Sequence, residues 1–244
     1  MVKHCVILVA GRNSRLDTGK PKSLLEINGV SLLERHIQLF SKEGCDNFCI
    51  VTGHNPEPIK EKVEELKKRY EVAINIAHND RYDLENGFSI SVVQNWVKSI
   101  NSEGFFLTMG DHVFDSLFIS SFQKDITKRD GKEALCLAVD TPSELNRHID
   151  IEDVTKVLIQ ETGYIEQIGK GIAKFNRYDT GLFYMKPDVF ESLNKCFAQG
   201  KYTISDLVTS LIQEYNATTI DVTGYLWNDV DNHSDLDITR KLYS

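Results

Sequence analysis

Short apolar runs alternate with segments of helical periodicity, and this alternation restricts the fold more than any other feature of the chain. Residues 6–10, 48–52 and 105–109 are apolar runs of strand length. The stretch 31–40, which lies between the first two runs, repeats its apolar residues at helical spacing after Ser31, a residue type that favours helix starts. Because strand–helix–strand units build parallel sheets covered by helices, the first half predicts a mainly parallel α/β sheet.

The second half predicts a different arrangement. Two short strands at 155–160 and 164–168 flank Glu161-Thr162-Gly163, a pattern typical of a β-hairpin. Further elements are expected as follows: strands at 178–185 and 217–222, and helices near 188–198, 204–215 and 235–242. The sequence contains no repeat, low-complexity tract or long linker. We therefore expect one domain over residues 1–244, a mixed sheet with helices on both faces and a β-hairpin extension.

Charge and composition exclude several classes of protein. The 244 residues carry a formal net charge of −8 and show no basic stripe, so a nucleic-acid partner is not expected. No apolar run approaches the ~20 residues that span a bilayer. The start, residues 1–4, leads directly into a strand, and we expect no signal peptide. An odd number of cysteines without a CxxC pair predicts buried thiols in a reducing cytoplasm: Cys5, Cys45, Cys49, Cys136 and Cys196.

A small, strongly positive loop follows the first strand. Gly11 ends the apolar run, and four cations and a single acid follow it: Arg12, Arg15, Lys20, Lys22 and Asp17. Backbone N–H groups of such a loop bind phosphate oxygens, while arginine and lysine supply charge in an otherwise acidic protein. Ligands of parallel sheets lie beyond the carboxyl ends of the strands, where Asp111 also falls. The loop therefore favours an anion with several charges, although a surface loop with scattered cations remains an alternative.

Two common phosphate motifs are excluded here. Seven residues separate Gly11 from Gly19, and Pro21 follows Lys20, which does not match a Walker loop. The dinucleotide fingerprint GxGxxG is also absent, because its later glycines are replaced in this loop. A different phosphate-binding arrangement is needed.

The stretch 8–24, "LVAGRNSRLDTGKPKSL", resembles the signature of nucleotidyltransferases that activate sugar phosphates and related phosphates, approximately L-A-A-G-x-G-x-R-L, a spacer and P-K-x-L. The matching residues are Gly11, Arg15, Leu16, Pro21, Lys22 and Leu24. Val9 and Asn13 depart from it, and Asn tolerates the positive φ that glycine would adopt. The motifs "ENGFSI", "MGDHVF", "DTGLFYM" and "LWNDVD" follow in the expected order. Together they resemble inositol-1-phosphate cytidylyltransferases most, with phosphocholine cytidylyltransferases as nearer relatives than the hexose-phosphate enzymes.

The resemblance implies a Rossmann-like sheet of the GT-A type and an Mg²⁺-dependent transfer of CMP from CTP to a phosphorylated polyol or aminoalcohol, with release of pyrophosphate. The first choice of acceptor is 1L-myo-inositol 1-phosphate. Phosphocholine or a sugar phosphate, with CTP, UTP or dTTP, is the alternative. About residues 1–130 would bind the nucleotide and about residues 131–244 the acceptor. A cytoplasmic location and a possible homodimer are further expectations.

Site residues follow from the resemblance, position by position. Arg15 matches the arginine that binds the triphosphate, and Lys22 the lysine that contacts the α-phosphate and the incoming phosphate. Nucleotide-binding positions are expected at Ala10, Gly11, Asn79, Asn86, Gly87 and Ser89. Any of the last three could instead cap a helix that begins near residue 88.

Metal and acceptor positions follow in the same way. Asp111 matches the metal aspartate, and either Asp229 or Asp231 would be the second carboxylate for Mg²⁺. A helix cap or a turn acid is the alternative for each. Lys170 matches the lysine on the acceptor phosphate, with Lys156 and Lys174 as competitors, and Asp179 and Thr180 would bind acceptor hydroxyls.

Two further classes remain open at this point. Asp229-Val230-Asp231 also spells the D-x-D of glycosyltransferases, which release a nucleoside diphosphate instead of pyrophosphate. A nucleotide-sensing subunit without turnover is the other, although Lys22, Asp111 and Asp229 are all present.

Overall fold

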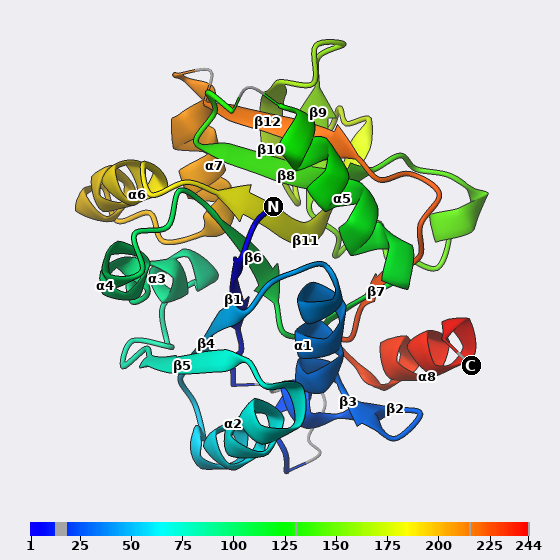
Figure 1. Ribbon diagram of the computed structural model, residues 1–244. Coiled ribbons are helices and arrows are strands. Elements are labelled where there is room, and N and C mark those ends of the chain that lie inside the picture. Colours follow the sequence, from blue (N-terminus) through cyan, green and yellow to red (C-terminus); the bar gives the residue numbers. More distant parts are fainter. Residues whose placement is uncertain (13–18, 130, 215, 244) are drawn as a thin grey trace.

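The protein is built on a nine-stranded mixed sheet (Figure 1). This computed structural model describes residues 1–12, 19–129, 131–214 and 216–243. The strand order is β10-β9-β11-β6-β1-β4-β5, and β8 and β12 extend the sheet from β11. Its strands are β1 (His4–Leu8), β4 (Asn47–Thr52), β5 (Ala73–His78), β6 (Phe105–Met109), β8 (Leu135–Asp140), β9 (Lys156–Ile159), β10 (Ile165–Gly169), β11 (Arg177–Met185) and β12 (Ala217–Asp221).

Strand direction changes at β11. The strands β5, β4, β1 and β6 are parallel, whereas β11 runs antiparallel to β6, β8 and β9. The hairpin β9–β10 is antiparallel, as the sequence predicted. Because β11 is reversed, its first residues lie at the edge of the sheet where β1 and β6 end. Residues from both halves of the chain therefore lie at the same edge of the sheet.

Helices cover both faces of the sheet. They are α1 (Leu32–Lys42), α2 (Glu57–Tyr70), α3 (Asn86–Ser91), α4 (Gln94–Ser99), α5 (Ser116–Lys128), α6 (Val189–Ala198), α7 (Ile204–Ile212) and α8 (His233–Leu242). Figure 1 shows α1 and α5 on one side of the sheet and α3, α4, α6 and α7 on the other. In β1, Cys5 and Ile7 belong to the first core, and Val6 and Leu8 to the second. Burial on both faces explains why this strand is apolar from Cys5 to Leu8.

Short elements complete the fold beside the main sheet. A small hairpin joins β2 (Glu26–Ile27) to β3 (Val30–Ser31), and the pair β7 (His112–Phe114) and β13 (Trp227–Asp229) is antiparallel. The 3₁₀ helices are η1 (Lys22–Leu24) and η2 (Glu144–Asn146). A third small core, which includes Leu236, packs α8 against the β7–β13 pair.

The predicted α/β fold class is confirmed, with local differences. Ser31 caps α1, because its hydroxyl accepts from the backbone N–H of Glu34 at 3.2 Å. The sequence reading missed α5 and β8, and Asp115 caps α5 by accepting from the backbone N–H of Leu117 at 2.8 Å. Asp111 therefore has no capping role on that helix. All five cysteines are free and buried, as expected. None of the helices in the described ranges could cross a membrane.

Candidate active site

A pocket of about 370 Å³ lies at the edge where β1 and β6 end and β11 begins. Its walls come from motifs spread along the chain. One side contains Ala10, Gly11, Tyr82, Leu84, Glu85, Asn86 and Ser89, and the other contains His112, Asp153, Val154, Thr155, Lys170, Asp179, Gly181 and Trp227. Asp111, Asp229 and Asp231 also line the pocket. A charged pocket at this edge agrees with the general position of ligands in such sheets.

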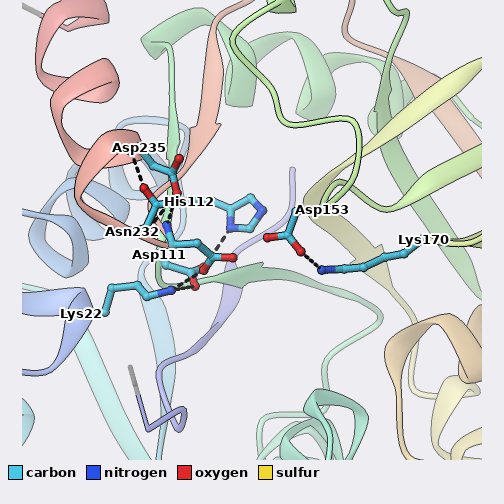
Figure 2. Close-up of polar contacts among 8 residues, drawn as sticks. Lys22, Asp111, His112, Asp153, Lys170, Asn232 and Asp235 are labelled. Atoms are coloured by element: carbon cyan, nitrogen blue, oxygen red, sulfur yellow. Dashed lines mark hydrogen bonds and ion pairs between the residues drawn. The ribbon is translucent and has the colours of Figure 1, made fainter. Parts of the chain in front are cut away.

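Lys22 connects two carboxylates at the pocket (Figure 2). Its Nζ donates to Oδ2 of Asp111 at 3.0 Å and to Oδ1 of Asp231 at 2.5 Å. The lysine side chain is only 11% exposed. Burial alone lowers the pKa of Lys22, but the two carboxylates outweigh burial and the net pKa is raised. The lysine therefore keeps its charge behind Asp111 and Asp231, which line the pocket, whereas Lys22 itself does not.

Each partner in this ion pair network is positioned by a different element. Lys22 opens η1 directly after Pro21, whose fixed φ restricts the direction of the chain. Asp111 lies in the turn between β6 and β7. The backbone N–H of Asp231 donates to Oδ2 of Asp235 at 2.9 Å, and Asp235 also belongs to the capping box of α8 with Asn232 (Figure 2). The start of α8 thus positions one of the lysine's two partners.

His112 supports Asp111 from the other side. Its Nδ1 lies 2.9 Å from Oδ1 of Asp111. Burial raises the pKa of Asp111, but Lys22 and His112 outweigh burial, so the net pKa is lowered and the carboxylate is ionised. Since an ionised carboxylate only accepts, Nδ1 donates. Burial lowers the pKa of His112, but Asp111, Asp229 and Asp179 outweigh burial and raise the net pKa. The imidazole thus favours its charged form beside three acids.

The acids at this edge fit a divalent cation that substrate oxygens help to bind. Burial raises the pKa of Asp229, as do the charges of Asp111 and Asp231, although His112 opposes them. Burial is the largest cause of this shift, and the two neighbouring carboxylates add to it. No group of three or more His, Cys, Asp or Glu in the described part of the chain could hold a metal alone. Of these acids, Asp111, Asp229 and Asp231 carry the oxygen ligands that divalent cations use, together with water or substrate oxygens.

Four of the six residues expected to bind the nucleotide line the pocket: Ala10, Gly11, Asn86 and Ser89. The other two do not line it. Asn79 is fully buried, and its side chain donates to the hydroxyl of Ser89 at 2.9 Å and accepts from the backbone of Arg81. A Cβ on Gly87 would lie 2.5 Å from the backbone oxygen of Tyr202, so this glycine allows α3 to approach the start of α7.

The side chain of Asn86 also has a structural contact. Its Oδ1 accepts from the backbone N–H of Ile204 at 3.0 Å, at the first residue of α7. Asn86 therefore lines the pocket while it satisfies an otherwise free helix donor. Arg15, expected on the triphosphate, lies outside the described residues.

The acceptor side contains Lys170 and Asp179 but not Thr180. The expectation for Thr180 is wrong, because its side chain is fully buried and donates to the backbone oxygen of Ala138 at 2.8 Å. Asp179 accepts from the backbone N–H of Gly181 at 2.8 Å, and burial raises the pKa of Asp179 to about 6.

The positions of Lys170, Lys156 and Lys174 distinguish among these three candidates for binding the acceptor phosphate. Nζ of Lys170 lies 2.5 Å from Oδ1 of Asp153 (Figure 2). Lys156 donates from Nζ to the backbone oxygen of Lys170 at 2.7 Å. Neither Lys156 nor Lys174 lines the pocket. Lys170 is therefore the candidate of the three.

A model of the MobA-like NTP transferase domain matches residues 5–160 of the chain. The chain belongs to this family. Two curated relatives carry names that specify an activity. A "Bifunctional IPC transferase and DIPP synthase" of Aquifex aeolicus (strain VF5) is 30% identical over 99% of this chain and 52% of the relative. A "Choline-phosphate cytidylyltransferase" of Streptococcus pneumoniae (strain ATCC BAA-255 / R6) is 27% identical over 50% of this chain and 49% of the relative.

A solved structure, the inositol-1-phosphate CTP transferase from T. maritima, superposes with a TM-score of 0.84. It is 26% identical, and the match covers 99% of this chain and 94% of the solved chain. By contrast, this chain spans about half the length of the curated relatives it matches. The similarity therefore covers one part of those bifunctional proteins.

The NTP transferase pocket also contains residues that sequence reasoning did not assign. Tyr82 lines the nucleotide side, and Cζ of Arg12 lies 5.3 Å from its ring centroid. Asp153 comes from the long connection between β8 and β9, which carries no motif. Trp227, within a quoted motif, lies parallel to the His112 ring, with an interplanar angle of 10° and centroids 6.4 Å apart. Of Tyr82, Asp153 and Trp227, only Trp227 could have been found from the sequence, because it belongs to the motif "LWNDVD".

Proposed function

We propose that this NTP transferase is an Mg²⁺-dependent cytidylyltransferase. It transfers CMP from CTP to a phosphorylated polyol or aminoalcohol, releases pyrophosphate and produces a CDP-alcohol. The observation that carries the proposal is the position of Lys22, whose Nζ bridges Asp111 and Asp231 at the pocket. The names of the bifunctional relatives and of the T. maritima structure support 1L-myo-inositol 1-phosphate as the first acceptor to test.

The reaction needs alignment and charge neutralisation more than acid–base catalysis. An oxygen of the acceptor phosphate forms a bond to the α-phosphorus of CTP, and the bond from that phosphorus to the bridging β-phosphate oxygen breaks. The attacking phosphate is already ionised, so no general base is required. Lys22 keeps its charge and would contact the α-phosphate and the incoming phosphate. Arg15 would bind the triphosphate.

Asp111 and one of its acidic neighbours would hold the cation. We favour Asp229, because it is the acid of the W-x-D segment and it lines the pocket. When bound, Mg²⁺ neutralises and polarises the triphosphate oxygens. His112 holds Asp111 in one orientation through the hydrogen bond from Nδ1. Asp231 would keep the lysine in place while the substrates bind.

The two halves of the pocket suggest how the substrates share it. Ala10, Gly11 and Ser89 come from residues 1–130 and would contact the nucleoside. Lys170 and Asp179 come from residues 131–244 and would bind the acceptor's phosphate and hydroxyl groups. We infer one domain with a nucleotide part and an acceptor part.

The chemistry of the acceptor side favours a polyol over choline. Quaternary ammonium groups bind to open aromatic faces. Trp227 is 2% exposed and lies parallel to the His112 ring, so it offers no such face. Asp179 offers a carboxylate oxygen to hydroxyl groups of a polyol.

A pyrophosphate-release assay tests the proposal. CTP, UTP and dTTP are each combined with inositol 1-phosphate, phosphocholine and glucose 1-phosphate, with and without Mg²⁺. We expect release with CTP and inositol 1-phosphate only when Mg²⁺ is present. Lys22→Met should lower turnover roughly 100- to 1,000-fold, as the loss of a preorganised charge does. Lys124→Met is the matched control, since Lys124 is an exposed lysine of α5.

Three outcomes would contradict the proposal. A folded protein that releases no pyrophosphate with any pair of substrates is not this enzyme. Tight CTP binding without turnover would indicate a nucleotide-sensing subunit, and release of free nucleoside diphosphate would indicate a glycosyltransferase. We also propose a cytoplasmic location, which the five buried free thiols support, and a homodimer, which sedimentation would test.

A further inference from the structure

Asp140, the last residue of β8, is a buried carboxylate that does not line the pocket. Its side chain belongs to a residue only 3% exposed. Oδ2 accepts from Nε1 of Trp227 at 2.9 Å and from Nδ2 of Asn146 at 2.7 Å. Oδ1 has no hydrogen-bond partner among the described residues. Burial of a half-satisfied carboxylate costs folding free energy, so Asp140 is a poor choice for stability alone.

The first partner of Asp140 leads to the reacting edge of the pocket. Trp227 begins β13, which ends at Asp229, and in the pairing with β7 Asp229 lies opposite His112. The Trp227 ring is parallel to the His112 ring, and His112 donates to Asp111. The hydrogen bond from Nε1 of Trp227 to Asp140 restricts rotation of the indole ring. It therefore sets the surface against which the His112 ring lies.

The second partner leads to the acceptor side. Asn146 belongs to η2 in the long connection 141–154, and its Nδ2 also donates to the backbone oxygen of Thr141 at 2.8 Å. In the same connection, Nε2 of His148 lies 3.1 Å from the backbone oxygen of Trp227. Further along it, Asp153 pairs with Lys170 at the pocket. The connection is thus held to the Trp227 side chain indirectly, through Asn146 and Asp140, and to the Trp227 main chain directly, through His148.

We propose that Asp140 is a positioning residue that couples the acceptor side of the pocket to the strand carrying Asp229. This inference rests on the proposed function for its kinetic consequence. Asp140 touches neither substrate nor cation. It fixes Trp227 and, through Asn146, the connection 141–154. Lys170 and Asp229 therefore keep fixed positions relative to each other on the two sides of the acceptor phosphate.

Kinetics of two variants test the coupling against a matched control. Asp140→Val removes both hydrogen bonds with little change of volume, whereas Asp140→Asn retains an oxygen that accepts from Trp227. Glu34→Gln is the control, because Glu34 is also a buried acid, 3% exposed, but it binds Lys62 and Tyr70 of α2, away from the pocket.

We expect Asp140→Val to raise the KM of the acceptor and lower kcat by about 10-fold, as the loss of a supporting hydrogen bond does at other sites. The KM of CTP should change much less, because the nucleoside side contacts none of this network. Asp140→Asn should recover most of the activity, and Glu34→Gln should lower only the melting temperature. A folded Asp140→Val protein with an unchanged acceptor KM overturns the proposal.

A second variant covers the case in which Asp140→Val does not fold. Trp227→Phe keeps an aromatic ring beside His112 but removes the N–H that binds Asp140. It should reproduce the acceptor defect by itself, and an unchanged acceptor KM in folded Trp227→Phe contradicts the coupling. Where Asp140→Val does fold, combination of the two changes should add little further loss, since both break the same contact. Defects that simply add would show that the two residues act independently, which contradicts the coupling.

Fluorescence quenching tests the positioning role of Asp140 independently of the proposed enzymatic function. The chain has two tryptophans, so in a Trp96→Phe background only Trp227 emits. Asp140→Val should increase acrylamide quenching of Trp227, while Asp140→Asn and Glu34→Gln should not. If no phosphate supports turnover, the proposed function fails, yet the quenching still reports the positioning. Equal quenching in all variants overturns the positioning role whatever the activity.

Discussion

Gly181 offers a sharp test of how the site is built. Its φ is +75°, and a Cβ at this position would lie 2.4 Å from Nε2 of His112. Ordinary contact begins near 3.4 Å, so the imidazole of a Gly181→Ala variant must retreat by about 1 Å. That movement would break or lengthen the 2.9 Å hydrogen bond from His112 to Asp111. Since a 1 Å misplacement costs on the order of 100-fold in rate, we expect kcat to fall by about that factor.

Backbone strain must be separated from the displaced histidine. Alanine at a positive φ costs roughly 1–2 kcal/mol of stability at any position. Gly200 has nearly the same φ, +73°, and a Cβ there would meet nothing within 4 Å. Gly200→Ala therefore carries the same strain without a contact at the pocket. We expect both variants to lose similar thermal stability, and only Gly181→Ala to lose turnover.

The assay is pyrophosphate release at saturating CTP and acceptor, at a temperature where circular dichroism shows both variants folded. Nuclear magnetic resonance of the histidine side chains adds a direct probe, because the His112 signals should shift in Gly181→Ala and not in Gly200→Ala. The reasoning is refuted if Gly181→Ala keeps wild-type kcat, or if Gly200→Ala loses as much activity as Gly181→Ala.

Three further predictions concern single side chains. Asp111→Asn should abolish turnover with Mg²⁺ at neutral pH and also lower the melting temperature, because it removes the charge that pairs with Lys22 and His112. Residual activity in the folded variant would exclude Asp111 as a metal ligand. Burial lowers the pKa of His36 to about 3, so the unfolded chain binds more protons and stability should fall below about pH 6.5, by about 2 kcal/mol at pH 5. Urea unfolding from pH 7 to 5 should show a shallower loss in His36→Phe, and an unchanged slope would contradict the burial argument. Lys170→Met should raise the acceptor KM without changing the CTP KM, whereas Lys174→Met should change neither, and equal effects would remove Lys170 from the acceptor site.

The sequence predicted most of the sheet, because periodicity reports burial directly. The run at residues 6–10 is apolar at every position, and the structure places alternate residues of β1 in two separate cores. By contrast, β8 and α5 were missed although β8 is buried throughout. Residues 135–139 are apolar like those of β1, so the local signal for β8 was present. The pairing of β8 with β11 and β12, which come later in the chain, is the part that no local pattern records.

Individual site residues show where the limit of sequence reasoning lies. Asp111, Lys170 and Asp179 were named from motifs and all line the pocket. Thr180 follows Asp179 in the same motif, but successive side chains of a strand point to opposite faces, and Thr180 bonds inside the core. Asn79 was similarly named as a ligand of the base and instead supports Ser89.

Local sequence by itself determined the elements, the cationic loop and the carboxylates at the strand ends, since these depend on residues within a few positions of one another. Only the tertiary structure decided that Lys22 meets Asp111 and Asp231, which are 89 and 209 positions away. It also decided that Asp140 reaches Trp227, 87 positions later. These contacts depend on strand order and on the reversal of β11, which long-range packing sets and no local pattern records.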